Sequence, residues 1–127
     1  MSKADPQAWI YSVRCTFPTT QIRDQWLIWL MDGHAQALLD AGALSATLIQ
    51  LETPALCVEV RYRFADRMAF ERYERDHAPA LREQGIRRWP AEMGLKYQRT
   101  EGAVIGYLDA KTQLDASQNV AITESPT

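Results

Sequence analysis

The sequence predicts an α+β domain in which two strand–helix–strand units form one four-stranded antiparallel sheet with two helices on one face. Two stretches, residues 9–17 and 57–64, alternate apolar and polar side chains, and this period of two is typical of a half-buried strand. After each of them, apolar residues recur at steps of three and four, as on the buried side of a helix. A second strand pattern follows each helix pattern, so the unit occurs twice.

Composition and cysteine content favour one globular domain in the cytoplasm. The chain has 127 residues, of which 46% are hydrophobic and 24% charged, enough for a single core. A chain of this size buries about two-thirds of its unfolded surface and needs no disulfide or metal to fold. Cys15 lies among the apolar residues of its strand and Cys57 among the polar residues of its own. We therefore expect free thiols on opposite sheet faces, as in a reducing compartment.

The first unit follows a short polar tail, residues 1–8. Its strand stops at Pro18, and Thr19 or Thr20 can cap the next helix, because a threonine hydroxyl accepts a hydrogen bond from an N–H of the first turn. Gly42 ends this helix by tolerating a positive φ, and residues 44–51 form the second strand. The inward stripe of the helix is broad and comprises Ile22, Trp26, Trp29, Leu30, Gly33 and Ala37, flanked by Leu27, His34 and Leu38.

The second unit begins after a turn at residues 52–56. In its strand, the apolar positions 58, 60, 62 and 64 face the core, whereas Glu59, Arg61 and Arg63 face away. Asp66 caps a helix, and Pro79 predicts a break near residue 77, because proline lacks an N–H and its ring clashes with the preceding turn. We expect a short second helix that ends at a glycine. The predicted inward stripe is Phe70, Tyr73, His77 and Leu81, and the predicted last residue is Gly85.

A last strand at about residues 95–102, with Leu95 and Tyr97 inward, completes the sheet. The apolar stretch 103–108 either extends this strand or covers a sheet edge, so the domain spans residues 9–108. Residues 109–127 have little periodicity and are expected to be a disordered tail. The order βαββαβ is the ferredoxin-like arrangement, with the strands standing in the order 4-1-3-2.

The strand VRYRF, the helix after it and the segment HAPALREQG resemble a bacterial family of small proteins of unknown function, which is similar to the dimeric α/β-barrel superfamily. The segment that begins at His77 carries most of this resemblance, which covers residues 9–101. The resemblance implies a homodimer of ferredoxin-like chains that pair their sheets. Some relatives, such as cofactor-light monooxygenases and haem-degrading enzymes, have a pocket between sheet and helices.

The polar sheet face also predicts a homodimer. Arg14 on the first strand and Glu59 and Arg61 on its neighbour, taken as parallel, are spaced for ion pairs across the strands. Such a face suits a charged, wet interface between two sheets, with residues 103–108 at the rim.

Several classes of function are unlikely. The sequence lacks a glycine-rich phosphate loop, a CxxC pair, an HExxH helix and a GxSxG elbow. RNA-binding sheets stack bases on exposed aromatic residues, but Tyr62 and Phe64 are predicted to lie under the helices, and the charges alternate in sign, so we expect no nucleic-acid partner. No run approaches the ~18 apolar residues of a membrane span, and the N-terminus has no apolar signal core, so we expect no membrane partner.

The candidate site is an aromatic-lined space between helices and sheet, which is either packed core or a pocket for a flat ligand. His77 either bridges backbone groups at the Pro79 break or acts in proton transfer, and His34 is either a half-exposed surface histidine or part of the pocket. A metal would need a further ligand, for which Cys15 is the only inward candidate, so neither metal nor cofactor is expected. The candidate ligand-binding residues are Trp26, Trp29, His34, Tyr62, Phe70, Tyr73 and His77, with Tyr11 beside them.

Three functions remain open at this point. The first is binding of a small aromatic molecule between helices and sheet. The second is a cofactor-light monooxygenase or isomerase with His77 as the base. The third is a structural or regulatory interaction module. An open, polar-lined cavity beside His77 would favour the enzyme, and a filled core would favour the other two.

Overall fold

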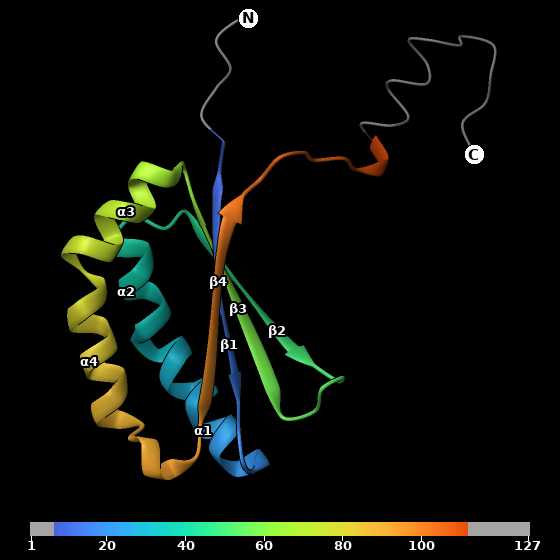
Figure 1. The fold of residues 1–127 in the computed structure, drawn as a ribbon. Helices are drawn as coiled ribbons and strands as arrows, with labels where there is room; N and C mark the ends of the chain where they lie inside the picture. The colour runs from blue at the N-terminus through green and yellow to red at the C-terminus, as the bar shows by residue number, and fades with distance from the viewer. Residues whose placement is uncertain (1–6, 112–127) are drawn as a thin grey trace, which may run out of the picture.

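The computed structural model describes residues 7–111, which form a four-stranded sheet with helices packed on one side (Figure 1). The sheet order is β2-β3-β1-β4, and all neighbouring strands are antiparallel. The ferredoxin-like order βαββαβ is therefore confirmed. The elements are β1 (Trp9–Thr16), α1 (Thr20–Trp29), the kinked segment η1 (Leu30–His34), α2 (Ala35–Asp40), β2 (Ser45–Leu51), β3 (Cys57–Phe64), α3 (Arg67–Asp76), α4 (Ala78–Arg88), the 3-10 turn η2 (Ala91–Met93) and β4 (Lys96–Ala103).

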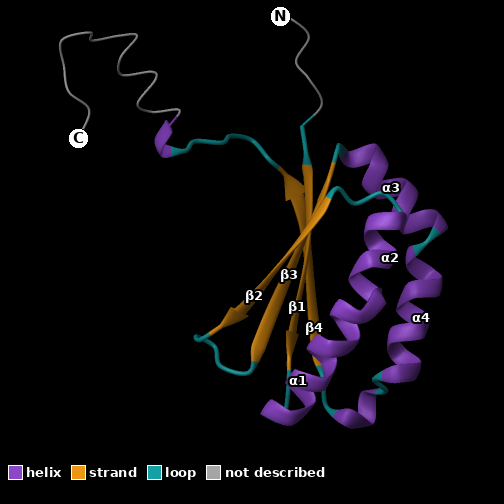
Figure 2. Cartoon of the chain, turned by 180° about the vertical axis from the view of Figure 1, so that it is seen from behind, coloured by secondary structure: helices purple, strands orange, loops and turns teal. Residues whose placement is uncertain are grey.

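The sheet separates a covered face from an open one. Figures 1 and 2 show α1 to α4 together on one side of the sheet in both views. The apolar positions of β1 and β3 face these helices, and Tyr62 and Phe64 are buried there as predicted. Cys15 lies on the same face and Cys57 on the other; both are buried free thiols. The two expected faces of the sheet are thus present.

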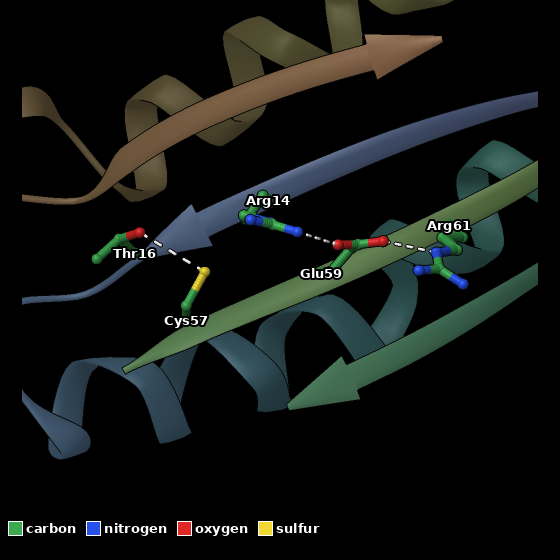
Figure 3. A network of polar contacts seen from close by, with 5 residues as sticks. All are labelled: Arg14, Thr16, Cys57, Glu59 and Arg61. Atoms are coloured by element: carbon green, nitrogen blue, oxygen red, sulfur yellow. Dashed lines mark hydrogen bonds and ion pairs between the residues drawn. The ribbon is translucent and has the colours of Figure 1, made fainter. Parts of the chain in front are cut away.

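On the open face, Glu59 connects two arginines (Figure 3). Its carboxylate accepts a hydrogen bond from Arg14 at 2.8 Å and one from Arg61 at 2.5 Å, and its side chain is only 8% exposed. The expectation that β1 and β3 run parallel is wrong: Arg14 stands opposite Glu59 in an antiparallel register. The reason is topological, because the hairpin turn after β2 reverses the chain before β3. Beside this network, the Thr16 hydroxyl donates to the Cys57 sulfur at 3.6 Å.

The first helical region is not the continuous helix that the periodicity predicts. Thr19 caps α1, since its hydroxyl accepts from the Ile22 N–H at 3.1 Å, and Gly42 has the predicted positive φ of 127°. Between them, however, the chain kinks in η1: Asp32 and Gly33 leave helical geometry, and Gly33 has a φ of 129° and is exposed. Such a kink rotates the inward face of the helix that follows. Gly33 and Ala37 therefore leave the inward stripe, and Leu38 becomes the buried residue.

The second helical region breaks where proline predicts it. Asp66 caps α3 by accepting from the Ala69 N–H at 2.8 Å, α3 ends at Asp76, and α4 starts at Ala78. The prediction that α4 ends at Gly85 is wrong, because Gly85 lacks the positive φ of a helix-ending glycine and the helix continues to Arg88. This extension adds a further turn of helix above the sheet.

The C-terminal strand extends only one hydrogen bond beyond β4. The Val104 N–H donates to the Ala8 carbonyl at 2.8 Å, after which Ile105, Tyr107 and Leu108 are exposed. In Figure 1 this segment, coloured orange, runs away from the sheet. The expected tails, 1–8 and 109–127, lie mostly outside the described residues and stay predictions. None of the helices within residues 7–111 combines the length and the apolar character needed to cross a bilayer.

Candidate functional site

A cavity of about 310 Å³ lies between the helices and the covered face of the sheet. The sheet supplies its floor through β1, β3 and β4, and α1, α3 and α4 supply its walls. Packed protein interiors leave few voids larger than a water molecule, so this is a hollow rather than an ordinary packing defect. The aromatic side chains that line it are Tyr11, Trp26, Trp29, Tyr62, Tyr73, Trp89 and Tyr97.

Five of the predicted ligand-binding residues line this cavity, namely Trp26, Trp29, His34, Tyr62 and Tyr73. They come from α1, η1, β3 and α3, so the tertiary fold brings them together across the two layers. Whether they bind a ligand stays a prediction.

Two predicted residues lie elsewhere. Phe70 packs into the core with its ring centroid 5.1 Å from that of Tyr11 and 5.3 Å from that of Phe64. The prediction that His77 points inward is wrong, because α3 ends one residue earlier and the stripe does not continue through the break. His77 is exposed, caps α4 with no side-chain hydrogen bond and is not among the residues that line the cavity. His77 is therefore not placed to act as a base on a molecule in this cavity.

Sequence reasoning missed Trp89 as a site residue. The sequence predicts that the helix ends at Gly85, which leaves Trp89 outside it. With α4 continuing to Arg88, Trp89 follows Arg82 by seven residues and therefore falls on the same helix face, two turns later. That spacing is the signal that could have identified it. Trp89 is 3% exposed, and its ring meets Trp29 edge to face at a centroid distance of 6.1 Å.

The polar end of the cavity is built around the Tyr11 hydroxyl. This oxygen accepts a hydrogen bond from Arg82 Nη2 at 3.3 Å and another from Arg99 Nε at 3.1 Å. Arg82 Nη2 also donates to Glu74 Oε2 at 2.6 Å. Burial works against the charged form of Arg82, but the hydrogen bonds to Tyr11 and Glu74 prevail and raise its pKa, so the guanidinium stays charged. The same three side chains, Tyr11, Arg82 and Arg99, border a second hollow of about 360 Å³ on the outer side.

Two residues that line the cavity each carry a buried N–H group with no hydrogen-bond partner among the described residues: Arg82 at Nε and Trp89 at Nε1. Another tryptophan of the wall has a partner, because Trp26 Nε1 donates to the Tyr97 hydroxyl at 3.1 Å. Native proteins rarely leave a buried donor unpaired, so each exception calls for an explanation.

Burial keeps one histidine and three tyrosines of the cavity uncharged. The His34 ring stacks on Trp29 at a centroid distance of 4.2 Å, and burial lowers the pKa of His34 to about 4, so it is a neutral imidazole at pH 7. Burial also raises the pKa of Tyr62 and of Tyr73, and it raises the pKa of Tyr97 to about 12. The phenols therefore keep their protons. Within residues 7–111, no group of three or more His, Cys, Asp or Glu side chains is placed to hold a metal ion.

Comparison with known proteins identifies a family and a fold. Residues 8–101 match the family model described as "Domain of unknown function (DUF4286)". This match confirms the resemblance to a family of unknown function. No curated protein matches the sequence.

Similar solved structures support the fold at low sequence identity. Two are dimeric ferredoxin-like proteins from an uncultured marine organism: one has a TM-score of 0.61 at 13% identity over 80% of this chain and 99% of its own, and the other a TM-score of 0.58 at 13% identity over 83% and 94%. A third is a monooxygenase from the gene ActVA-Orf6 of Streptomyces coelicolor, in complex with the ligand nanaomycin D, with a TM-score of 0.62 at 15% identity over 80% and 91%. These likenesses establish the ferredoxin-like fold of the chain.

Proposed function

The chain belongs to the DUF4286 family, whose description assigns no function, and we propose that it binds a flat aromatic molecule in the cavity between helices and sheet. One observation carries the proposal: a cavity of about 310 Å³ whose walls are mainly aromatic. Ligand pockets are typically about 300–1,000 Å³ and combine apolar walls with a few convergent polar groups. Tyr11, Arg82 and Arg99 are such polar groups here.

The structural neighbours add support at the level of the fold. The ActVA-Orf6 monooxygenase was solved with nanaomycin D, so a protein of this fold can hold a small molecule. At 15% identity, its ligand and reaction are not transferred to this chain. The cavity does not lie beside His77 and its walls are mainly aromatic, so it gives no support to an enzyme with His77 as base. A structural or regulatory interaction module, the third function left open by the sequence, assigns this hollow no role.

Ligand binding is tested by calorimetric titration with 2-naphthoate, a probe with a flat apolar body. Leu81 lines the cavity, so Leu81→Trp should block it and abolish binding. Leu44→Trp is the matched control, because Leu44 is 62% exposed and does not line the cavity. Full binding by the Leu81→Trp variant would place the probe elsewhere and contradict the proposal.

We also propose that the protein is a cytoplasmic homodimer. Two of the neighbours are dimeric ferredoxin-like proteins, and the open sheet face carries the partly exposed arginines of the Glu59 network. Free buried thiols at Cys15 and Cys57 suit a reducing compartment. Sedimentation at micromolar concentration should show a dimer. A monomer there would refute this part of the proposal, and a dimer that is insensitive to Val104→Asp with Ile105→Asp would remove segment 103–108 from the interface.

A second candidate function is proton transfer on a bound substrate, as in a cofactor-light monooxygenase or isomerase. The observation that favours it is the position of His34 at the cavity wall, where its neutral imidazole can accept a proton, although the burial that lowers its pKa to about 4 also makes it a weak base. In this candidate His34 takes the place of His77. The test is deuterium exchange at the carbon next to the carbonyl of 1-tetralone in D₂O, followed by NMR. Exchange that is faster than in buffer and is lost in His34→Gln would support it, and exchange at the buffer rate would exclude this activity.

A further inference from the structure

We propose that the cavity selects aromatic acids in their anionic form, with the acidic oxygen held at Arg82 and a second oxygen acceptor at Trp89. This inference rests on the proposed function, because it names the chemical class of the molecule that the cavity takes. It comes from three features of the wall: its unpaired hydrogen-bonding groups, its charge, and the distance between the two residues that carry the unpaired groups.

The unpaired groups of the wall are donors. Arg82 Nε and Trp89 Nε1 are buried without a partner among the described residues, and both side chains line the cavity. A guanidinium and an indole nitrogen can only donate hydrogen bonds. The Tyr11 hydroxyl already accepts from Arg82 and Arg99, so its own hydrogen remains to be donated. A ligand that satisfies this wall must therefore offer acceptors.

The charge of the wall is positive. Of the described side chains that line the cavity, Arg82 and Arg99 are charged, and none is an aspartate or glutamate. Glu74 pairs with Arg82 from the side of the second hollow and does not line the cavity itself. The ion pairs found within residues 7–111 include none to Arg99. The charged side chains that line the cavity itself are thus both cationic, whereas Glu71, Glu74 and Glu101 border the second hollow. Partial burial strengthens the attraction of the two guanidinium groups for an anion in the cavity.

The two residues that carry the orphan donors are well separated along α4. Arg82 and Trp89 are seven residues apart, at the inward face of α4 and at its C-cap, so their backbones are about 10 Å apart along the helix axis at 1.5 Å per residue. The aromatic walls of Trp26, Trp29 and Tyr62 lie along the same hollow. An elongated ring system with its anionic oxygen at Arg82 and a carbonyl or ether oxygen toward Trp89 would pair both donors.

The test compares three probes that share one ring system: 2-naphthoate, 2-naphthamide and 2-naphthylmethylammonium. Calorimetry should show 2-naphthoate binding at least about 10-fold more tightly than the amide, because a hydrogen bond to a charged group is roughly twice as strong as a neutral one. The ammonium probe should bind weakest, since the positive wall repels it. Equal affinity for the anion and the ammonium would overturn the inference, and would indicate that ordered water satisfies the orphan donors.

Substitutions at Arg82 and Trp89, with a control at Arg87, locate the selectivity. Arg82→Met should bring the affinity ratio between naphthoate and naphthamide close to one, whereas Arg87→Met should leave it unchanged, because Arg87 is exposed on the same helix and pairs with Glu83. Trp89→Phe keeps an aromatic ring but removes the indole N–H together with the smaller ring that carries it. It should weaken 6-methoxy-2-naphthoate, which carries a second acceptor, more than 2-naphthoate. If Arg82→Met does not fold, Arg82→Lys, which keeps the charge, should retain part of the preference for the anion.

The outcomes separate this inference from the proposed function. If all three probes bind and Leu81→Trp blocks them, but the anion is not preferred, the cavity binds aromatic molecules and the inference fails. If no probe binds, both fail. An unchanged ratio in Arg82→Met would also overturn the inference, because the selectivity would then arise away from Arg82.

Discussion

Replacing Gly85 by alanine should stabilise the protein and, at the same time, weaken ligand binding. Gly85 lies inside α4, where glycine costs about 0.5–1 kcal/mol relative to alanine, because its backbone loses more freedom on folding. Its φ is not in the left-handed region, so alanine can adopt the same backbone without strain. The glycine therefore carries a cost in stability that the helix itself does not require.

The structure leaves room for the methyl group. A Cβ at position 85 would lie 3.8 Å from Cη2 of Trp29, which is an ordinary van der Waals contact. The gain from backbone entropy is then not offset by a clash, and we expect about 1 kcal/mol of stabilisation, or a rise in Tm of about 4 °C for a domain of this size. The same methyl group enters a cavity that Gly85 lines, so the affinity for 2-naphthoate should fall by on the order of 10-fold.

Urea unfolding measures the first effect, with the midpoint rising while the m-value stays constant. Gln84→Ala is the matched control, because Gln84 is exposed on the same helix, and its change should stay within about 0.5 kcal/mol. Loss of stability in Gly85→Ala would refute the backbone argument. Stabilisation with unchanged affinity would show that the space beside Trp29 is not part of the ligand site.

Three further changes are predicted. Burial lowers the pKa of His34 to about 4 from its usual 6.5, so the unfolded chain binds more protons than the folded chain between these pH values, and the free energy of unfolding should fall by up to about 2 kcal/mol from pH 7 to pH 4. Urea titrations of His34→Gln should lack this loss, and an identical pH dependence in the variant would contradict the prediction. Glu59→Gln should cost about 1–2 kcal/mol of stability at pH 7, because hydrogen bonds from two arginines lower the pKa of Glu59, and the stability that its carboxylate contributes is lost only in acid below its usual pKa of 4.5. The control Glu71→Gln, at an exposed glutamate, should change stability by less than about 0.5 kcal/mol, and equal effects of the two substitutions would count against the network. His77→Ala should be neutral within about 0.5 kcal/mol by thermal melting, whereas a loss of about 1–3 kcal/mol would restore a backbone-bridging role.

Local features of the fold could be predicted because their causes are local. The caps at Thr19 and Asp66 follow from side-chain oxygens near free N–H groups, and the break before Pro79 follows from a missing donor. The alternation along β1 and β3 separates the two sheet faces for the same reason, since side chains of a strand point to opposite sides.

Features that depend on a second element were predicted less well. The kink around Gly33 interrupts an apolar periodicity that predicts a continuous helix, and the His34 ring there stacks on Trp29. Gly85 resembles a helix end in sequence, but nothing nearby in the chain shows that Trp29 occupies the space beside it. This error concealed Trp89 as a site residue.

The sequence by itself determined the ferredoxin-like order of elements and the aromatic character of the space between helices and sheet, because period, caps and proline act over a few residues. Only the tertiary structure decided that Trp26, Trp29 and Tyr62 border a cavity instead of filling it, since a void depends on how side chains from separate elements fit together. It also decided that Arg82 and Trp89 face that cavity while His77 does not, because the direction of a side chain depends on where its helix ends and what packs against it.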